Sequence, residues 1–239
     1  DITTNSTTAG KCEAIVSRDG DLINRMYLEL NVTNSSAVGA GDAVQDYNIT
    51  SILLDSVELQ IGGQRIDKQS GAWMEAWAQL TEPNPDATSP VYSDPTEGTL
   101  FQKMSGFGGC NRDGSDVFSA GLNPKFFVPL FFWFCRNPGL ALPLIALQYH
   151  EVKIILNHNF NANFTTSLVN KLWCDYIYLD TDERRRFAQV SHEYLIEQVQ
   201  EQAITPAGTS ELNFNHPVKE LIWTKFGSVL SGHTDWHPV

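Results

Sequence analysis

Basic residues are scarce in this chain of 239 residues. It holds 16 Lys and Arg against 28 Asp and Glu, which gives a formal net charge of -12. Non-specific binding to nucleic acid and attachment to anionic membranes both depend on clustered Lys and Arg. The composition therefore argues against both roles. We interpret the run Arg184, Arg185, Arg186 as a solvated turn neutralised by the preceding acids, with a phosphate or acidic contact as the alternative.

Cysteine is also sparse, and no pair has the C-x-x-C spacing of a zinc or redox site. The four residues are Cys12, Cys110, Cys135 and Cys174. Cys135 and Cys174 sit in apolar, strand-like runs, so we expect free and mostly buried thiols from a reducing compartment. A Cys135–Cys174 disulfide is the alternative.

The sequence lacks the common signatures of catalysis. No G-x-S-x-G nucleophile elbow occurs, and none of the six histidines forms an H-x-H pair. We expect His150 and Glu151 in one strand, where adjacent side chains face opposite sides and cannot share a metal. We therefore predict that the protein is not an enzyme and has no catalytic, cofactor-binding or metal-binding residues.

No uninterrupted apolar stretch is long enough for a membrane span. The most apolar region, residues 126–147, is broken by Pro129, Arg136, Pro138 and Pro143, and reads better as two buried β segments. Its first part, residues 126–135, is apolar on both faces, as in a strand covered from both sides. Phe131, Phe132 and Trp133 are our candidates for core or interface positions. The polar start of the chain predicts no signal peptide.

The main pattern in the sequence is an alternation of apolar and polar residues with a period of two. Met26, Leu28, Leu30 and Val32 alternate with polar residues, which predicts a half-buried strand. A second alternating run ends at Ile61 and meets Gly62-Gly63, which predicts a tight hairpin. Further strands are predicted at residues 147–156, 172–179, 194–200 and 212–223, and short helices at 71–80, capped by Ser70, and at 182–189. The pattern predicts an all-β sandwich but does not separate a jelly roll from an immunoglobulin-like one.

Five asparagines stand in N-x-S/T sequons, a mild excess over chance. They are Asn5, Asn31, Asn34, Asn48 and Asn163. A β protein with polar loops gives a similar number, so these are weak candidates for glycosylation.

Five segments in register resemble one protein family. They are SRDGDLI (17–23), VELQIGGQRIDK (57–68), RNPGLALPLIALQYHEVK (136–153), DYIYLDTDERRRFAQVSHEYLIEQVQ (175–200) and LNFNHP (212–217). Together they are similar to the double jelly-roll major capsid proteins of nucleocytoplasmic large DNA viruses, nearest to the algal-virus branch.

The resemblance implies an eight-stranded antiparallel jelly roll and a division of the chain. Residues 1–202 would form the first jelly roll, with a long decorating loop at 82–124. Residues 203–211 would be an interdomain linker, and residues 212–239 would begin a second jelly roll that is truncated here. The implied function is structural: trimers form pseudo-hexagonal capsomers that tile the icosahedral shell of a double-stranded DNA virus. The alternative is a carbohydrate-binding jelly-roll module on the virion surface.

The implied partners are other copies of the chain in a homotrimer, neighbouring capsomers and minor capsid proteins. Glycans are a further candidate, direct contact with nucleic acid is not expected, and an internal viral membrane would lie nearby without being entered. The implied location is the capsid shell of the virion, assembled in the host cytoplasm.

Overall fold

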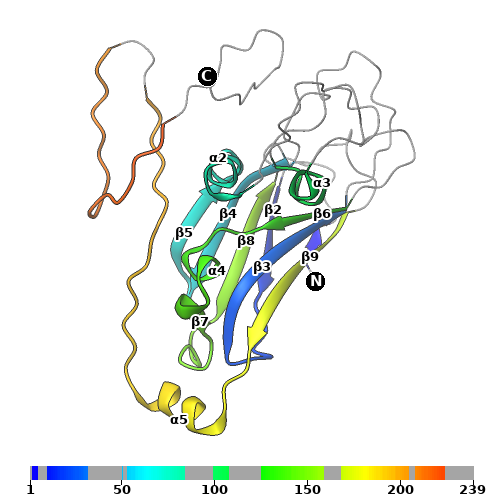
Figure 1. Cartoon of the computed structure of the whole chain (residues 1–239), viewed down its shortest axis with the longest axis vertical. Coiled ribbons are helices and arrows are strands. Elements are labelled where there is room, and N and C mark those ends of the chain that lie inside the picture. Colours follow the sequence, from blue (N-terminus) through cyan, green and yellow to red (C-terminus); the bar gives the residue numbers. More distant parts are fainter. Residues whose placement is uncertain are drawn as a thin grey trace.

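The computed structural model describes residues 2–4, 10–31, 50, 53–83, 99–107, 125–158, 168–204 and 208–223. In these ranges the chain forms two antiparallel sheets and several short helices (Figure 1). Strands that neighbour each other in a sheet are mostly far apart in the sequence, because the chain crosses repeatedly between the sheets. The all-β sandwich predicted from the alternation is confirmed.

The first sheet has five strands with β3 (Leu22–Asn31) at its centre. On one side β3 pairs with β9 (Leu168–Ile177), which in turn pairs with β1 (Ile2–Thr4). On the other side it pairs with β6 (Lys125–Pro129) and β7 (Leu142–Pro143). The inward side chains of Met26, Leu28 and Leu30 are 2% exposed or less, as the alternation predicts.

The second sheet has four strands in the order β2 (Gly10–Ile15), β8 (Val152–His158), β4 (Leu54–Ile61) and β5 (Gln64–Ser70). The β4–β5 hairpin turns through Gly62 and Gly63, with φ values of 60° and 82°. Positive φ at both central residues gives the primed turn whose twist matches the strands. The predicted hairpin is confirmed.

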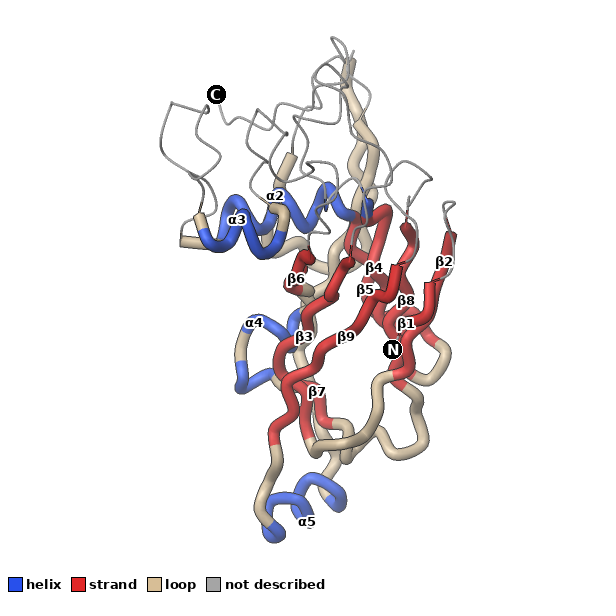
Figure 2. The backbone as a smooth tube through the Cα atoms, turned by 90° about the vertical axis from the view of Figure 1, so that its right-hand side faces the viewer, coloured by secondary structure: helices blue, strands red, loops and turns tan. Residues whose placement is uncertain are grey.

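The core lies between the two sheets. It contains the inward residues of β3, β4 and β8 together with aromatic residues that follow β6. Loops and helices close its ends: Figure 2 shows α2 (Gly71–Thr81) and α3 (Leu100–Ser105) at one end of the strands and α5 (Thr181–Gln189) at the other. None of the helices in the described ranges has the length and apolar character needed to cross a bilayer.

The helices begin at side-chain caps. Ser70 caps α2, and its Oγ accepts a hydrogen bond from the Trp73 amide, as predicted. Asp180 caps α5 by accepting from the amides of Asp182 and Glu183. α3 falls within the region predicted as a loop, and its start is a capping box in which Thr99 and Gln102 bond reciprocally. The other parts of that loop, residues 84–98 and 108–124, lie outside the described residues.

Four predicted strands differ from the structure. Residues 126–135 do not form one strand, because β6 ends at Pro129 and the chain turns into α4 (Trp133–Arg136) and the 3-10 helix Pro138–Leu140. The strand expected from residue 147 starts at Val152, after a run of turns that includes His150. Residues 194–200 and 212–223 belong to neither sheet, and the second run bends at Asn215, at His216 (φ of 69°) and at Lys219. Their alternation is real, but they lack a strand to pair with among the described residues.

Candidate functional site

The predicted core or interface residues follow β6. Phe131 and Phe132 precede α4 and Trp133 is its first residue, and their exposed fractions are 7%, 0% and 5%. Phe131 packs against Phe107, with ring centroids 6.2 Å apart. Trp133 meets Phe134 edge to face at 5.2 Å. The structure thus places all three in the core of this chain, where they pack the start of α4 and the residues before it against the sandwich.

Arg136, at the end of α4, connects three parts of the molecule. Its Nε donates to the Phe131 carbonyl at 3.2 Å, and its Nη1 lies 2.7 Å from Oε2 of Glu197. The guanidinium also lies over the Trp77 ring of α2, 4.2 Å from the centroid. A planar, always-charged group with several donors suits this combination of stacking and bonding.

Asp67 on β5 is a buried carboxylate, 3% exposed. It accepts hydrogen bonds from the backbone amides of Lys68 and Val199 and from Nε2 of Gln69, each at 2.9 Å. Burial raises the pKa of Asp67 above its usual range, although these three donors oppose the shift. The carboxylate therefore depends on a donor that belongs to a distant part of the chain.

That distant part is the arm, defined as residues 190–204 and 208–223. It leaves α5 and runs past the β5 edge of the sandwich (Figure 1). Gln198 donates to the Ile66 carbonyl at 2.5 Å, and Ile196 packs against the core. Contact with β5 and α4 is therefore concentrated at residues 196–199.

The arm doubles back on itself. The side-chain amide of Gln200 donates to the Asn215 carbonyl and accepts from the Asn215 amide, at 3.2 and 2.9 Å. Gln202 does the same with the Glu211 carbonyl and the Asn213 amide, at 2.8 and 2.9 Å. Two glutamine side chains thus replace the backbone ladder of a β-hairpin.

Apolar side chains on the arm are exposed. Leu195 is 90% exposed and Trp223 is 78% exposed, and several others exceed 40%: Val190, Ile204, Leu212, Val218 and Leu221. A concentration of exposed apolar residues on one segment marks an interaction surface.

The contact of residues 196–199 with β5 and α4 is one junction of the sandwich. A second lies at its far end, at residues 17–21, and is called the base junction. Arg18 donates to three backbone carbonyls of the turn before β8: Gln148 at 2.5 Å, Leu147 at 2.6 Å and His150 at 3.0 Å. The Ser17 carbonyl accepts from the Tyr176 hydroxyl at 2.8 Å. These bonds join the loop before β3 to the chain near β8 and β9.

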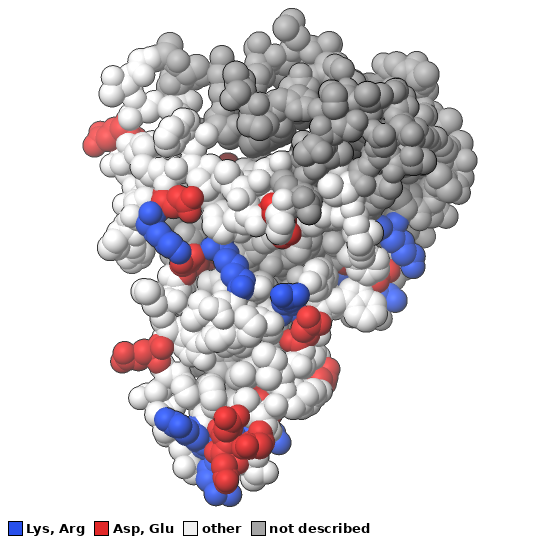
Figure 3. Space-filling view, in the orientation of Figure 1, with Lys and Arg blue, Asp and Glu red and all other residues white. Residues whose placement is uncertain are grey.

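Asp21 ties the same junction to α5. One carboxylate oxygen accepts from the Leu179 amide at 2.9 Å, and the other lies 3.0 Å from Nε of Arg184. Arg185 instead pairs with Asp182 at 3.8 Å, so local neutralisation describes Arg185 but not Arg184. Figure 3 shows acidic and basic side chains gathered together over α5.

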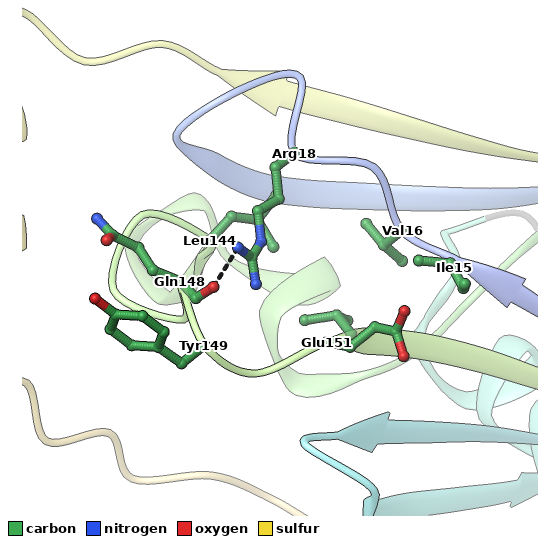
Figure 4. A pocket seen from close by; sticks show the side chains of 8 residues that line it. Ile15, Val16, Arg18, Leu144, Gln148, Tyr149 and Glu151 are labelled. Carbon is green, nitrogen blue, oxygen red and sulfur yellow. Dashed lines mark hydrogen bonds between the residues drawn. The ribbon is translucent and has the colours of Figure 1, made fainter.

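A pocket of about 390 Å³ opens beside the base junction (Figure 4). Its lining residues are Ile15, Val16, Arg18, Leu144, Gln148, Tyr149, Glu151 and Val152. The Arg18 donors that face it are already bonded to carbonyls, and Glu151 pairs with Lys153 at 3.1 Å. Of these polar groups, Arg18 holds the turn before β8.

The outer face of the first sheet carries a polar cluster around Glu29. Trp173 donates its indole N–H to Oε2 of Glu29 at 2.8 Å, while Asn31 donates to Oε1 at 3.2 Å and Lys125 lies 3.7 Å from it. The Trp173 bond is the main cause that lowers the pKa of Glu29, followed by smaller contributions from Asn31 and Lys125. Trp173 itself is half exposed.

The other residues considered from the sequence are scattered. Cys135 and Cys174 are free, and Cys174 lies opposite Met26 in the β3–β9 pair. Burial raises the pKa of both thiols to about 12, and Cys174 is near enough to Cys135 to contribute to the raised pKa of Cys135. Asn31 ends β3, while Asn5, Asn34, Asn48 and Asn163 lie outside the described residues, as does Cys110. Within the described ranges, no three His, Cys, Asp or Glu side chains form a candidate metal site.

Sequence reasoning missed Arg136, Asp67 and Glu197. The sequence alone assigns no contact to Arg136, although a charge inside an apolar run is itself a sign of a paired, partly buried group. Asp67 lies in an alternating strand and gives no comparable signal. The Arg136–Glu197 contact and the bond from the Val199 amide to Asp67 both join segments more than sixty positions apart in the chain.

The two packed antiparallel sheets define a jelly-roll sandwich, and the junctions at its two ends are structural. A family model described as "Major capsid protein N-terminus" matches residues 1–180, and one described as "Large eukaryotic DNA virus major capsid protein" matches residues 183–228. The chain therefore belongs to the major capsid protein family of large eukaryotic DNA viruses.

Relatives and solved structures agree. The chain is 47% identical over 219 residues to the major capsid protein of Pyramimonas orientalis virus, which covers 89% of this chain and 51% of the relative. It is 38% identical over 233 residues to that of Paramecium bursaria Chlorella virus 1, covering 89% and 48%. The quasi-atomic structure of the PBCV-1 virus capsid matches with a TM-score of 0.63 and 34% identity over 91% of this chain and 52% of that chain. The chain thus spans about half the length of these relatives.

Proposed function

We propose that this chain is the first jelly roll, with the start of a second, of a structural capsid protein. The full-length protein would trimerise into pseudo-hexagonal capsomers that tile an icosahedral shell. The observation that carries this proposal is the succession of two capsid family matches over residues 1–180 and 183–228, on a sandwich similar to a solved capsid.

The proposed boundaries are residues 1–202 for the first jelly roll, 203–211 for the linker and 212–239 for the start of the second. The last strand of the two sheets, β9, ends at Ile177, and α5 and the arm follow. The arm exposes apolar residues that neither sheet covers. This supports a second packed unit over the arm, since a concentration of exposed apolar residues marks an interaction surface.

The proposed partners are other copies of the chain, neighbouring capsomers and minor capsid proteins, with glycans as a further candidate. The proposed location is the virion shell, assembled in the host cytoplasm near an internal membrane. The net charge of -12 supports a role without direct contact to nucleic acid. A non-enzymatic role agrees with the structural use of the charged residues at both junctions.

The test is the mass and oligomeric state of the protein purified from its native particle. We expect a subunit mass about twice the 26.7 kDa of this chain, and light scattering at about three times the subunit mass. A stable monomer under native conditions would overturn the capsomer proposal. Specific, saturable binding on a glycan array would then favour the carbohydrate-binding alternative.

A further inference from the structure

We propose that Glu197 is the charge link between the first jelly roll and the second, and that β5 and α4 form a docking site for residues 196–199. This rests on the proposed two-domain organisation. The site would fix the point at which the chain leaves the first jelly roll, so that the return run, residues 208–223, starts from a defined position.

Glu197 uses its two carboxylate oxygens for different parts of the molecule. Oε2 lies 2.7 Å from Nη1 of Arg136 on α4, whereas Oε1 pairs with Nζ of Lys219 in the return run. Both cations are among the causes that lower the pKa of Glu197, with Lys219 first. One carboxylate thus joins the sandwich, the outgoing arm and the return run.

On the sandwich, the groups that meet the arm are held by several contacts. Arg136 is held by the Phe131 carbonyl and by stacking on Trp77, and Phe131 itself is buried. Gln69 Nε2 donates to the same Phe131 carbonyl at 3.1 Å and also to Asp67. The groups that meet the arm are therefore positioned by the core before the arm arrives.

The arm is bound to β5 mainly through hydrogen bonds to backbone groups. Asp67 accepts from the Val199 amide, and Gln198 donates to the Ile66 carbonyl. These bonds place the arm in one register along β5, because shifting it by one residue would point the Val199 amide away from the buried carboxylate. Losing that donor would leave Asp67 with less compensation for its burial.

The side chains of the arm support a local contact rather than general adhesion. Ile196, Glu197 and Val199 are partly buried, while Leu195 just before them is 90% exposed. The contact is thus confined to residues 196–199, as expected for a docking site.

Amide hydrogen exchange of the 239-residue chain tests the link. Val199 reports the contact with Asp67, and Asn215 reports the return run, because its amide donates to Gln200. Arg136→Gln should raise exchange at Val199 about tenfold, the loss of roughly one charged hydrogen bond. Lys219→Gln should raise exchange at Asn215 but not at Val199, and Glu197→Gln should raise both.

Arg65→Gln is the matched control, because Arg65 is an exposed cation on the same strand as Asp67. It should leave both amides unchanged, and amides of β3 should stay protected in every variant, which shows that the sandwich is folded. Equal exchange at Val199 in the wild type and in Glu197→Gln would overturn the proposal. The assay needs no assembly, so its failure is distinct from failure of the capsomer proposal.

Discussion

At the scale of single residues, the two glycines of the β4–β5 turn differ in what an added side chain would meet. Gly62 has φ of 60°, and a Cβ there would lie 2.6 Å from Nδ1 of His150. Gly63 has φ of 82°, but a Cβ there would meet nothing within 4 Å. Comparing an alanine at Gly62 with an alanine at Gly63 therefore separates the cost of backbone strain from the cost of steric overlap.

We expect Gly62→Ala to lower the free energy of unfolding by about 2 kcal/mol, of which about 1 kcal/mol is the left-handed backbone. Gly63→Ala, the matched control, should cost only the backbone part. Urea denaturation of both variants measures the difference. Equal losses would show that His150 moves aside without cost.

Trp133 tests the aromatic core after β6. Trp133→Ala should cost about 3–5 kcal/mol, because it removes a large side chain that is 5% exposed. Trp223→Ala should cost less than about 0.5 kcal/mol, since that indole is 78% exposed. Urea denaturation measures both free energies of unfolding. A loss below about 0.5 kcal/mol for Trp133→Ala would contradict the assignment of Trp133 to the core.

At the scale of elements, sequence reasoning succeeded where local rules act and failed where distant contacts decide. The β4–β5 hairpin and the Ser70 cap follow from neighbouring residues, so both were predicted. α3 was missed although Thr99 and Gln102 form a readable capping box. After β6 the chain turns into α4 and buries its aromatic rings, with Phe131 against Phe107, a contact that alternation does not reveal. Arg136 and Asp67 became visible as a site only once the arm was in place.

Trp173 on β9 predicts a pH dependence for the outer face of the first sheet. Its indole N–H holds the pKa of Glu29 below the ordinary value of 4.5. A lowered pKa adds stability that is present above the ordinary value and is lost as pH falls through the lowered one. Trp173→Phe should therefore cost about 1 kcal/mol at neutral pH and less in acid, where Glu29 is protonated.

Urea denaturation across the acid range measures this difference. Trp223→Phe serves as the control, because Trp223 lies on the arm and not on the sheet. A cost of Trp173→Phe that is equal at neutral and acid pH would contradict the role of Glu29.

At the scale of the whole molecule, the sandwich is joined to an arm that contacts it at residues 196–199 and leaves most of its apolar side chains exposed. If a second jelly roll packs over the arm, Trp223 should become buried in the longer protein. The fluorescence lost on Trp223→Phe should then differ between the two proteins. In the longer protein the lost emission should be blue-shifted and protected from quencher. In the 239-residue chain it should be red-shifted and accessible to quencher. The same accessible emission in both proteins would contradict packing over the arm.

The base junction also constrains the order of events during synthesis. Asp21 is 6% exposed and bonds Leu179 and Arg184, so its partners emerge from the ribosome about 160 residues after it. Closing a loop of that length brings little reward until the far end is present. The strands β2 and β3 therefore wait, incompletely paired, until β8 and β9 have been made, and a nascent chain stopped before residue 179 would hold Asp21 without these partners. Translation speed through β9 and α5 thus sets how long the unfinished sheet is exposed to aggregation.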